Sequence, residues 1–522
     1  MDLRGRMKTL TGLLVHHLLM ITVAAMFVPS SPSQAKVQKT EVHFQRYAGA
    51  SLDAQLRAAV AAYAGKPATL VLIQDTAGTF AAPATLRAND DLLFNASASF
   101  ASGAYVVANG GNRISCAANV VLTTKTPNTS LIRAEGNGID VGNCTASGGG
   151  GDSAVVAAPV ARHAQHLRVH DLVVKDIGVA NLGGVDDAEV WKFDATASRR
   201  GGTAYGVVMT GDSTHVRVHD GSVKLFGHGV EWFNADANLS RGGPKTRAQV
   251  GAHGGWYTIE TMQCESVTGA CVWGSVAHDI VSRNNVSRNA GDVGFDCEGC
   301  IDYRSENDSS TEAANGGFAT FFYADNNVFV RPHHTSSTGK SGVMIFNDSR
   351  MPGVNTRTAV IDGVINCYNV ACVGVGGNAS QGLQVTGTQF LNASITPNDY
   401  WAGPTIKNNH FTASAAMGPA INLGTLFGGG VVSVEGNTFE GGFKQAAGVS
   451  CVVVKNVDYN APVAVVLKQN RCAGGFTGDW DATSGSGNAG VGMNLTLDGN
   501  VETHAGMALH GFGGRDRVLK GK

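Results

Sequence analysis

Short apolar segments, separated by turns rich in Gly, Asn and Asp, recur along the chain from about residue 160 onward. The steps between aligned segments are 23, 42, 23, 23, 25 and 30 residues, and the 42-residue step contains an insertion after Glu231. A strand-like unit repeated at this period predicts a solenoid, in which each coil stacks its strands on those of the next coil. The residues on which the segments align are Gly206, Gly229, Cys271, Gly294, Gly317, Gly342 and Cys372.

The alternation of side chains along a strand assigns an inner and an outer face to this repeat. The position after each aligned residue is always apolar, and we expect it to point into the core: Val207, Val230, Val272, Phe295, Phe318, Val343 and Val373. The next position then points outward: Val208, Glu231, Trp273, Asp296, Ala319, Met344 and Gly374. Two more outward columns are Thr210, Phe233, Ser275, Glu298, Phe321, Phe346 and Gly376, and Ala204, Gly227, Gly269, Asp292, Asn315, Lys340 and Val370.

Two other segments precede the repeat. Residues 1–35 combine early basic residues, an apolar stretch from Leu10 to Val28 and small residues at Ser33-Gln34-Ala35. This order is typical of a cleavable secretory signal, with a membrane anchor as the alternative, and no later apolar run is long enough to span a bilayer. The second segment, Ser51 to Gly65, has apolar residues at helical spacing and predicts a helix that caps the stacked strands.

Repeated strands, Asn-centred turns such as KNNHF and EGNTF, and this helix resemble the right-handed parallel β-helix of the pectate-lyase-like superfamily of polysaccharide-active enzymes. The resemblance covers residues 40 to 510. It implies an all-β fold, with an N-terminal cap and first strands over residues 36–100, a β-helix of coils of about 23 residues over 101–510, and a C-terminal tail over 511–522.

Ten cysteines are consistent with a secreted or periplasmic protein, because disulfides persist in oxidising compartments. No second CxxC accompanies Cys297 and Cys300, so a zinc site is not expected. The pairs that we expect are Cys116–Cys144, Cys264–Cys271, Cys297–Cys300, Cys367–Cys372 and Cys451–Cys472.

The net charge of −2 argues against a nucleic-acid partner, which requires a concentrated basic surface. We expect a monomer that acts on an acidic polysaccharide and has no stable membrane insertion after the signal is removed.

Acidic and aromatic residues gather on the predicted outer face. Asp292, Asp296 and Glu298 share it, and Glu231 lies two coils from Asp296, so their Cα atoms are expected to be roughly 10 Å apart. Trp273, Phe233, Phe321 and Phe346 border these acids. Aromatic rings beside carboxylates suit a sugar site. The alternative is a solvated strand face whose aromatics are covered by a loop such as the insertion after Glu231.

Lyases of this fold suggest one chemistry for the patch, β-elimination from a uronate polymer. Asp292, Asp296 and Glu298 are then expected to bind Ca²⁺, and Lys340 is the candidate base that removes the proton at C5. Glu231, Asn315, Arg331 and His333 are further candidates for substrate binding, together with Trp273, Phe321 and Phe346.

Three alternatives remain open from the sequence. Glycoside hydrolysis would use Asp296 and Glu298, which are about 7 Å apart along one strand. The polygalacturonase signatures are absent except for Gly227-His228-Gly229, and His228 falls in an inward column. Epimerisation is the second alternative, but the chain lacks the Asp-Pro-His-Asp motif of the alginate epimerases. A non-catalytic polysaccharide-binding or surface β-helix is the third alternative.

Overall fold

The computed structural model describes residues 39–237, 246–346, 355–426, 431–441, 450–456, 463–473, 478–483, 492–501, 507–510, 512 and 516–521. The predicted signal peptide, residues 1–35, lies outside these ranges and stays a prediction. Within the described ranges, no helix is long and apolar enough to cross a membrane.

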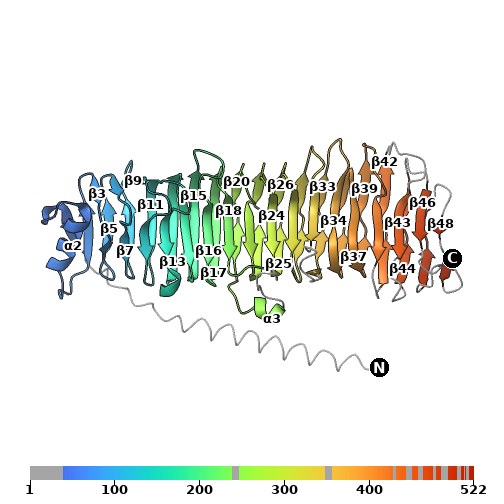
Figure 1. The fold of residues 1–522 in the computed structure, drawn as a ribbon, viewed down its shortest axis with the longest axis horizontal. Helices are drawn as coiled ribbons and strands as arrows, with labels where there is room; N and C mark the ends of the chain where they lie inside the picture. Colours follow the sequence, from blue (N-terminus) through green and yellow to red (C-terminus); the bar gives the residue numbers. More distant parts are fainter. Residues whose placement is uncertain are drawn as a thin grey trace, which may run out of the picture. The chain divides into compact units, whose positions relative to one another are not determined.

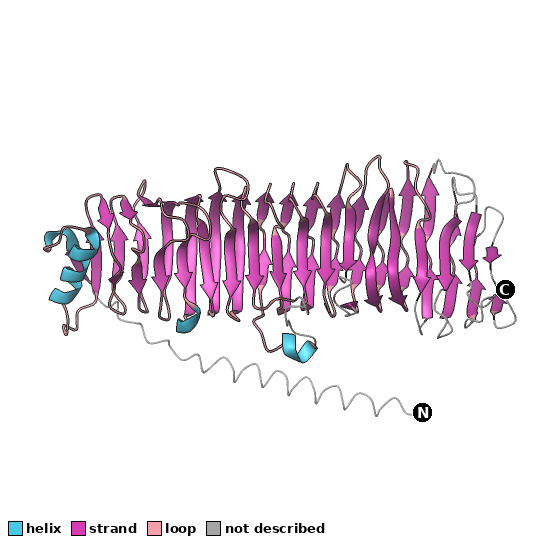
Figure 2. Cartoon of the chain, viewed as in Figure 1, coloured by secondary structure: helices cyan, strands magenta, loops and turns pink. Residues whose placement is uncertain are grey.

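The described chain is a solenoid of parallel strands stacked in two ladders (Figure 1), with little helix (Figure 2). The predicted parallel β-helix is confirmed. The first ladder contains β4 (Ala84–Thr85), β7 (Val106–Ala108), β10 (Ser130–Ala134), β12 (Ala154–Ala158), β14 (Gly178–Gly183), β16 (Tyr205–Thr210), β18 (His228–Phe233), β21 (Val272–Ser275), β24 (Val293–Glu298), β27 (Gly316–Phe321), β30 (Ser341–Phe346), β31 (Asn355–Thr356), β34 (Cys372–Gln381), β37 (Ala393–Ala402), β40 (Ile421–Leu426), β43 (Ser450–Asn456), β46 (Gly478–Thr483) and β48 (Met507–His510).

The second ladder takes up the remaining strands, in many coils two short ones in succession. It contains β1 (Thr40–His43), β2 (Leu70–Gln74), β3 (Gly78–Phe80), β5 (Asp91–Phe94), β6 (Ala98–Phe100), β8 (Arg113–Cys116), β9 (Val121–Thr124), β11 (Asp140–Ser147), β13 (Gln165–Lys175), β15 (Asp186–Thr196), β17 (Thr214–Lys224), β19 (Thr258–Glu260), β20 (Gln263–Glu265), β22 (His278–Arg283), β23 (Val286–Arg288), β25 (Ile301–Glu306), β26 (Ser309–Thr311), β28 (Val328–Val330), β29 (His333–Thr335), β32 (Ala359–Ile361), β33 (Val364–Asn366), β35 (Gln384–Thr386), β36 (Gln389–Leu391), β38 (Thr405–Lys407), β39 (His410–Ala413), β41 (Val431–Glu435), β42 (Thr438–Gly441), β44 (Val463–Lys468), β45 (Arg471–Cys472), β47 (Met493–Asp498) and β49 (Arg517–Lys520).

Helices are few and short. The predicted helix forms as α2 (Leu52–Ala62) and packs on β3 and β4. The others are η1 (Phe44–Arg46), η2 (Val160–Arg162) and α3 (Arg247–Val250), which belongs to the insertion after Glu231. Strand pairing extends beyond the expected limits of the β-helix, because β4 pairs with β7 and β49 pairs with β47.

The predicted inner column forms the core of the first ladder. Its members pair in successive strands and none is exposed: Val207, Val230, Val272, Phe295, Phe318 and Val343. The last predicted member is wrong, because Val343 pairs with Val375 and not with Val373. The connection from β30 to β34 is two residues longer than the alignment assumed. A shift of two residues leaves the inner and outer faces unchanged.

Corners between strands repeat a left-handed backbone conformation, which Asn and Asp tolerate better than most residues. In one corner of the second ladder, φ lies between 50° and 57° at Lys192, Asp220, Thr261, Asn284, Asn307, Arg331 and Asp362. This local requirement explains the frequent Asn and Asp in the repeat.

All five predicted disulfides form. Cys297 lies between Asp296 and Glu298 in the sequence, so its bond to Cys300 ties the acidic end of β24 to the start of β25.

Buried amides form a row inside the solenoid. The side-chain oxygens of Asn437 and Asn470 each accept hydrogen bonds from the backbone and side chain of the Asn in the preceding coil. Asp308 occupies the equivalent position beside Asn285, and the backbone nitrogen of Asn285 donates to Asp308 Oδ1 at 2.8 Å. Its Oδ2 accepts from the hydroxyls of Ser282 and Ser305. Burial raises the pKa of Asp308 to about 6, although these hydrogen bonds oppose the rise.

Asp308→Asn is expected to stabilise the fold at neutral and alkaline pH. The folded-state pKa of Asp308 lies above its unfolded value of 3.8, so its contribution to stability is complete below about pH 4 and is lost as the pH rises through 6. An amide avoids the buried charge, and the gain above pH 6 is about 3 kcal/mol. Unfolding by urea at several pH values checks this. The reverse substitution in the same row of buried amides, Asn409→Asp, should lower the free energy of unfolding over the same pH range. A pH-independent effect of both substitutions would contradict the explanation.

Candidate functional site

The predicted outer column is present on the first ladder. Glu231 on β18 pairs with Trp273 on β21, and Trp273 pairs with Asp296 on β24. Ala319 and Met344 follow as predicted, but Met344 pairs with Gly376 instead of Gly374, because of the same two-residue shift after β30. Adjacent strands lie about 4.8 Å apart, so Glu231 and Asp296 are about 10 Å apart along the ladder.

A second outer column runs beside the first. Glu298 pairs with Phe321, which pairs with Phe346, so both aromatic residues lie in line with the acid. Phe233 and Phe346 are exposed, at 45% and 36%. The ring centroid of Phe233 lies 6.3 Å from that of Trp273. The structure therefore brings the predicted aromatic side chains to the border of the acids.

Asp296 is the most buried acid of this face, with 5% of its surface exposed. Its Oδ1 is buried and has no hydrogen-bond partner within the described ranges. Burial raises the pKa of Asp296 well above its usual value, and the charges of Glu298 and Asp292 raise it further. Burial therefore favours the protonated form of Asp296, and a protonated carboxyl group can donate a proton.

The two other acids of the strand face are also difficult to ionise. Burial raises the pKa of Glu298 to about 7, against a hydrogen bond with Trp273 that lowers it, while Asp236 and Asp292 add to the rise. Burial and the charge of Asp152 raise the pKa of Glu231 to about 8. Three neighbouring carboxyl groups with raised pKa values do not fit a solvated strand face, and such groups cluster at functional sites.

His228 lies on the outer face, contrary to its predicted inward position. Its ring centroid lies 4.9 Å from that of Trp273, and its Nε2 is 3.9 Å from Glu231 Oε2. A Cβ on Gly229 would lie 2.5 Å from Cys264 Sγ, so Gly229 and Val230 both face inward and the alternation breaks between them. Burial lowers the pKa of His228 to about 4, so the ring is neutral at neutral pH.

Sequence reasoning missed three neighbours of the acids. Asp152 lies in the glycine-rich stretch after β11, and its charge acts on both Glu231 and Tyr205. The Tyr205 hydroxyl donates to the backbone oxygen of Asp152 at 2.9 Å. Asp236 belongs to the insertion after Glu231 and acts on Glu298. No local pattern marks these residues, because coil stacking alone brings them to the acids.

The remaining predicted residues fall into two groups. Asn315 donates to Asp292 Oδ1 at 2.6 Å, and Lys340 directly precedes β30, two coils from Asp292 as predicted. Lys340 is exposed and makes no ion pair with a described residue. Arg331 and His333 belong to the second ladder, where they contact Asn307 and Ser309, so the structure does not bring them to the acids.

The predicted calcium ligands do not fit a metal site in their present arrangement. Asp292 is exposed at the corner before β24, whereas Asp296 is buried on the strand. In the part of the chain that the structure describes, no group of three or more His, Cys, Asp or Glu side chains is placed to hold a metal ion. Calcium requires six to eight oxygens around one point.

The sequence matches no family model and no curated protein. Solved structures match at low identity. The A-module of mannuronan C-5 epimerase AlgE6 from Azotobacter vinelandii has 12% identity and a TM-score of 0.36, over 90% of this chain and 94% of that chain. The Family 28 exopolygalacturonase of Yersinia enterocolitica has 10% identity and a TM-score of 0.41, over 74% and 77%. The surface adhesin PfbA of Streptococcus pneumoniae has 8% identity and a TM-score of 0.37, over 83% and 91%.

Proposed function

We propose that the face around Asp296 binds a polysaccharide and hydrolyses it. The observation that carries this proposal is the pair Asp296 and Glu298, two carboxyl groups on one face of β24 whose pKa values are both raised by burial. Their Cα atoms are about 7 Å apart. Inverting glycosidases hold their two carboxyl groups about 6.5–9.5 Å apart, which leaves room for a water molecule, and side chains on the same face of one strand can reach that separation.

Each acid has a separate role in this reaction. Asp296, whose protonated form is favoured by burial, donates a proton to the oxygen of the leaving sugar. Glu298, ionised in about half of the molecules near pH 7, accepts a proton from the water that attacks the anomeric carbon. Trp273, Phe321 and Phe346 provide apolar surfaces for sugar rings on either side of the pair.

Elimination, the chemistry first expected from the resemblance, has less support. It needs a base at the sugar ring and a group that neutralises the substrate carboxylate. Lys340 is exposed and unpaired among the described residues, and the carboxylates are not gathered for calcium. The neutral acid beside an ionisable one is the arrangement that hydrolysis uses.

Product analysis distinguishes the two reactions. Polygalacturonate, alginate and a neutral glucan are incubated with the protein, with and without a chelator. We expect new reducing ends, no ultraviolet absorbance from unsaturated uronates and no effect of the chelator. Lys340→Ala should change the rate by less than about twofold. Unsaturated products that disappear in Lys340→Ala would establish elimination instead, and binding of a polymer without any product would indicate a binding protein.

A further inference from the structure

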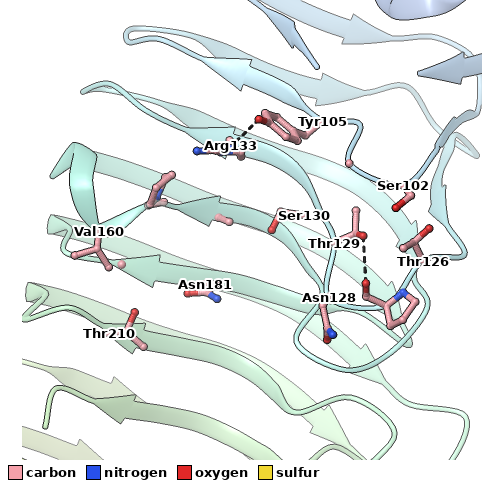
Figure 3. A pocket seen from close by; sticks show the side chains of 16 residues that line it. Ser102, Tyr105, Thr126, Asn128, Thr129, Ser130, Arg133, Val160, Asn181 and Thr210 are labelled. Carbon is pink, nitrogen blue, oxygen red and sulfur yellow. Dashed lines mark hydrogen bonds between the residues drawn. The ribbon is translucent and has the colours of Figure 1, made fainter. Parts of the chain in front are cut away.

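A hollow of about 590 Å³ lies on the outer face of the first ladder, several strands before the acids (Figure 3). It extends from Tyr105, beside β7, across β10, β12 and β14 to Thr210 at the end of β16. Loops form its edges, with Ser102 and Asn128 on one side and Val160 on the other. Several residues contribute hydroxyl or amide groups to its lining: Ser102, Thr126, Asn128, Thr129, Ser130, Asn181 and Thr210.

Arg133 is the only charged residue among the described residues that line this hollow. Its Nη1 donates to the Tyr105 hydroxyl at 2.8 Å, and its guanidinium carbon lies 4.7 Å from the centroid of the same ring. Tyr105 therefore holds the guanidinium plane through both contacts. The side chain of Arg133 is 31% exposed, so it is open to a ligand.

Arg133 shares an acidic partner with a second arginine. Its Nη2 lies 2.9 Å from Glu135 Oε1, and the other oxygen of Glu135 lies 3.2 Å from Arg162 Nε. Two guanidinium groups thus share one carboxylate. A guanidinium has five N–H donors, and these contacts with Tyr105 and Glu135 leave others for an anion.

Strand register connects the hollow with the acids. Arg133 pairs with Ala157, Ala157 with Asn181, Asn181 with Val208, and Val208 with Glu231. Arg133 therefore belongs to the same outer column as Glu231, four rungs away, or about 19 Å. At the far end of the hollow, Thr210 pairs with Phe233, which borders the acids.

We propose that the hollow binds a carboxylate-bearing sugar of the same polysaccharide chain that reaches the acids. Arg133 pairs with the sugar carboxylate, and the hydroxyl and amide groups around it bind the sugar hydroxyls. An extended pyranose chain advances by a length similar to one rung for each sugar, so the bound segment from Arg133 to Glu231 contains about four sugars. The inference rests on the proposed function and narrows its substrate to acidic polysaccharides.

The test measures binding separately from cleavage. All proteins carry Asp296→Asn, so that polymer is not consumed, and binding is measured by affinity gel electrophoresis. The probes are polygalacturonate, alginate, hyaluronate and carboxyl-reduced polygalacturonate, which has the same chain without the charge. We expect at least one acidic polymer to bind, and Arg133→Gln to weaken its binding by about tenfold. The carboxyl-reduced polymer should bind weakly and equally to both proteins.

Two further variants control this test. Arg113→Gln removes an exposed arginine from β8 in the second ladder and should leave binding unchanged. Tyr105→Phe keeps the ring but removes the hydroxyl, and should weaken binding by about threefold if Arg133→Gln fails to fold. Unchanged binding in both Arg133→Gln and Tyr105→Phe, or no binding of any acidic polymer, would overturn this inference. Binding that depends on Arg133, without hydrolysis in the unmodified protein, would overturn the proposed function alone.

Discussion

Asp296→Asn is expected to lower kcat by about three orders of magnitude, with no loss of folded protein. The amide matches the shape of the carboxyl group but has no proton to donate to the leaving oxygen. Because burial raises the pKa of Asp296 and favours its neutral form, a neutral amide at this position should be tolerated by the fold. Rates of reducing-end formation and the melting temperature, measured on the same preparations, check both parts.

The pH dependence of kcat/KM is an independent test of the roles of Asp296 and Glu298. Glu298 must be ionised to accept a proton, and its pKa is about 7, so kcat/KM should rise with pH through that value. The value of kcat/KM should fall again at higher pH as Asp296 ionises.

Glu298→Gln should remove most of the activity. Asp194→Asn changes an acid of the second ladder that contacts Ser222, and it should have no effect. Full activity in Asp296→Asn would exclude Asp296 as the acid.

Phe318→Ala is expected to destabilise the fold by about 3–5 kcal/mol, because it opens a cavity in the core. The Phe318 ring is fully buried, and its centroid lies 5.1 Å from that of Phe295. Urea unfolding measures the loss.

Phe346→Ala is the matched control for the Phe318→Ala substitution. Phe346 lies on the outer face of the next strand and is 36% exposed, so its removal should cost less than about 1 kcal/mol. It should instead weaken polysaccharide binding, which Phe318→Ala should reduce only through loss of folded protein. Equal destabilisation by the two substitutions would mean that the inner and outer faces are assigned wrongly.

Much of the fold was predictable because its rules act locally. Side chains alternate along each strand, and the repeat places equivalent residues in one column, so the positions of Glu231, Trp273 and Asp296 follow from spacing alone. The disulfide pairs were predictable for a related reason, since every pair joins cysteines no more than 28 residues apart in the sequence. The same spacing identified the acidic and aromatic patch.

Only the tertiary structure decided which residues complete the site. Two consecutive inward positions at Gly229 and Val230 turned His228 outward, and a longer connection moved Val375 into the place expected for Val373. Arg133 joins the face of Glu231 through four strand pairings, each of which depends on the length of the loop between coils. The high pKa of Asp296 arises from burial beneath its neighbours. The alternation within one strand is set by local backbone geometry, whereas stacking register and desolvation depend on contacts between distant coils.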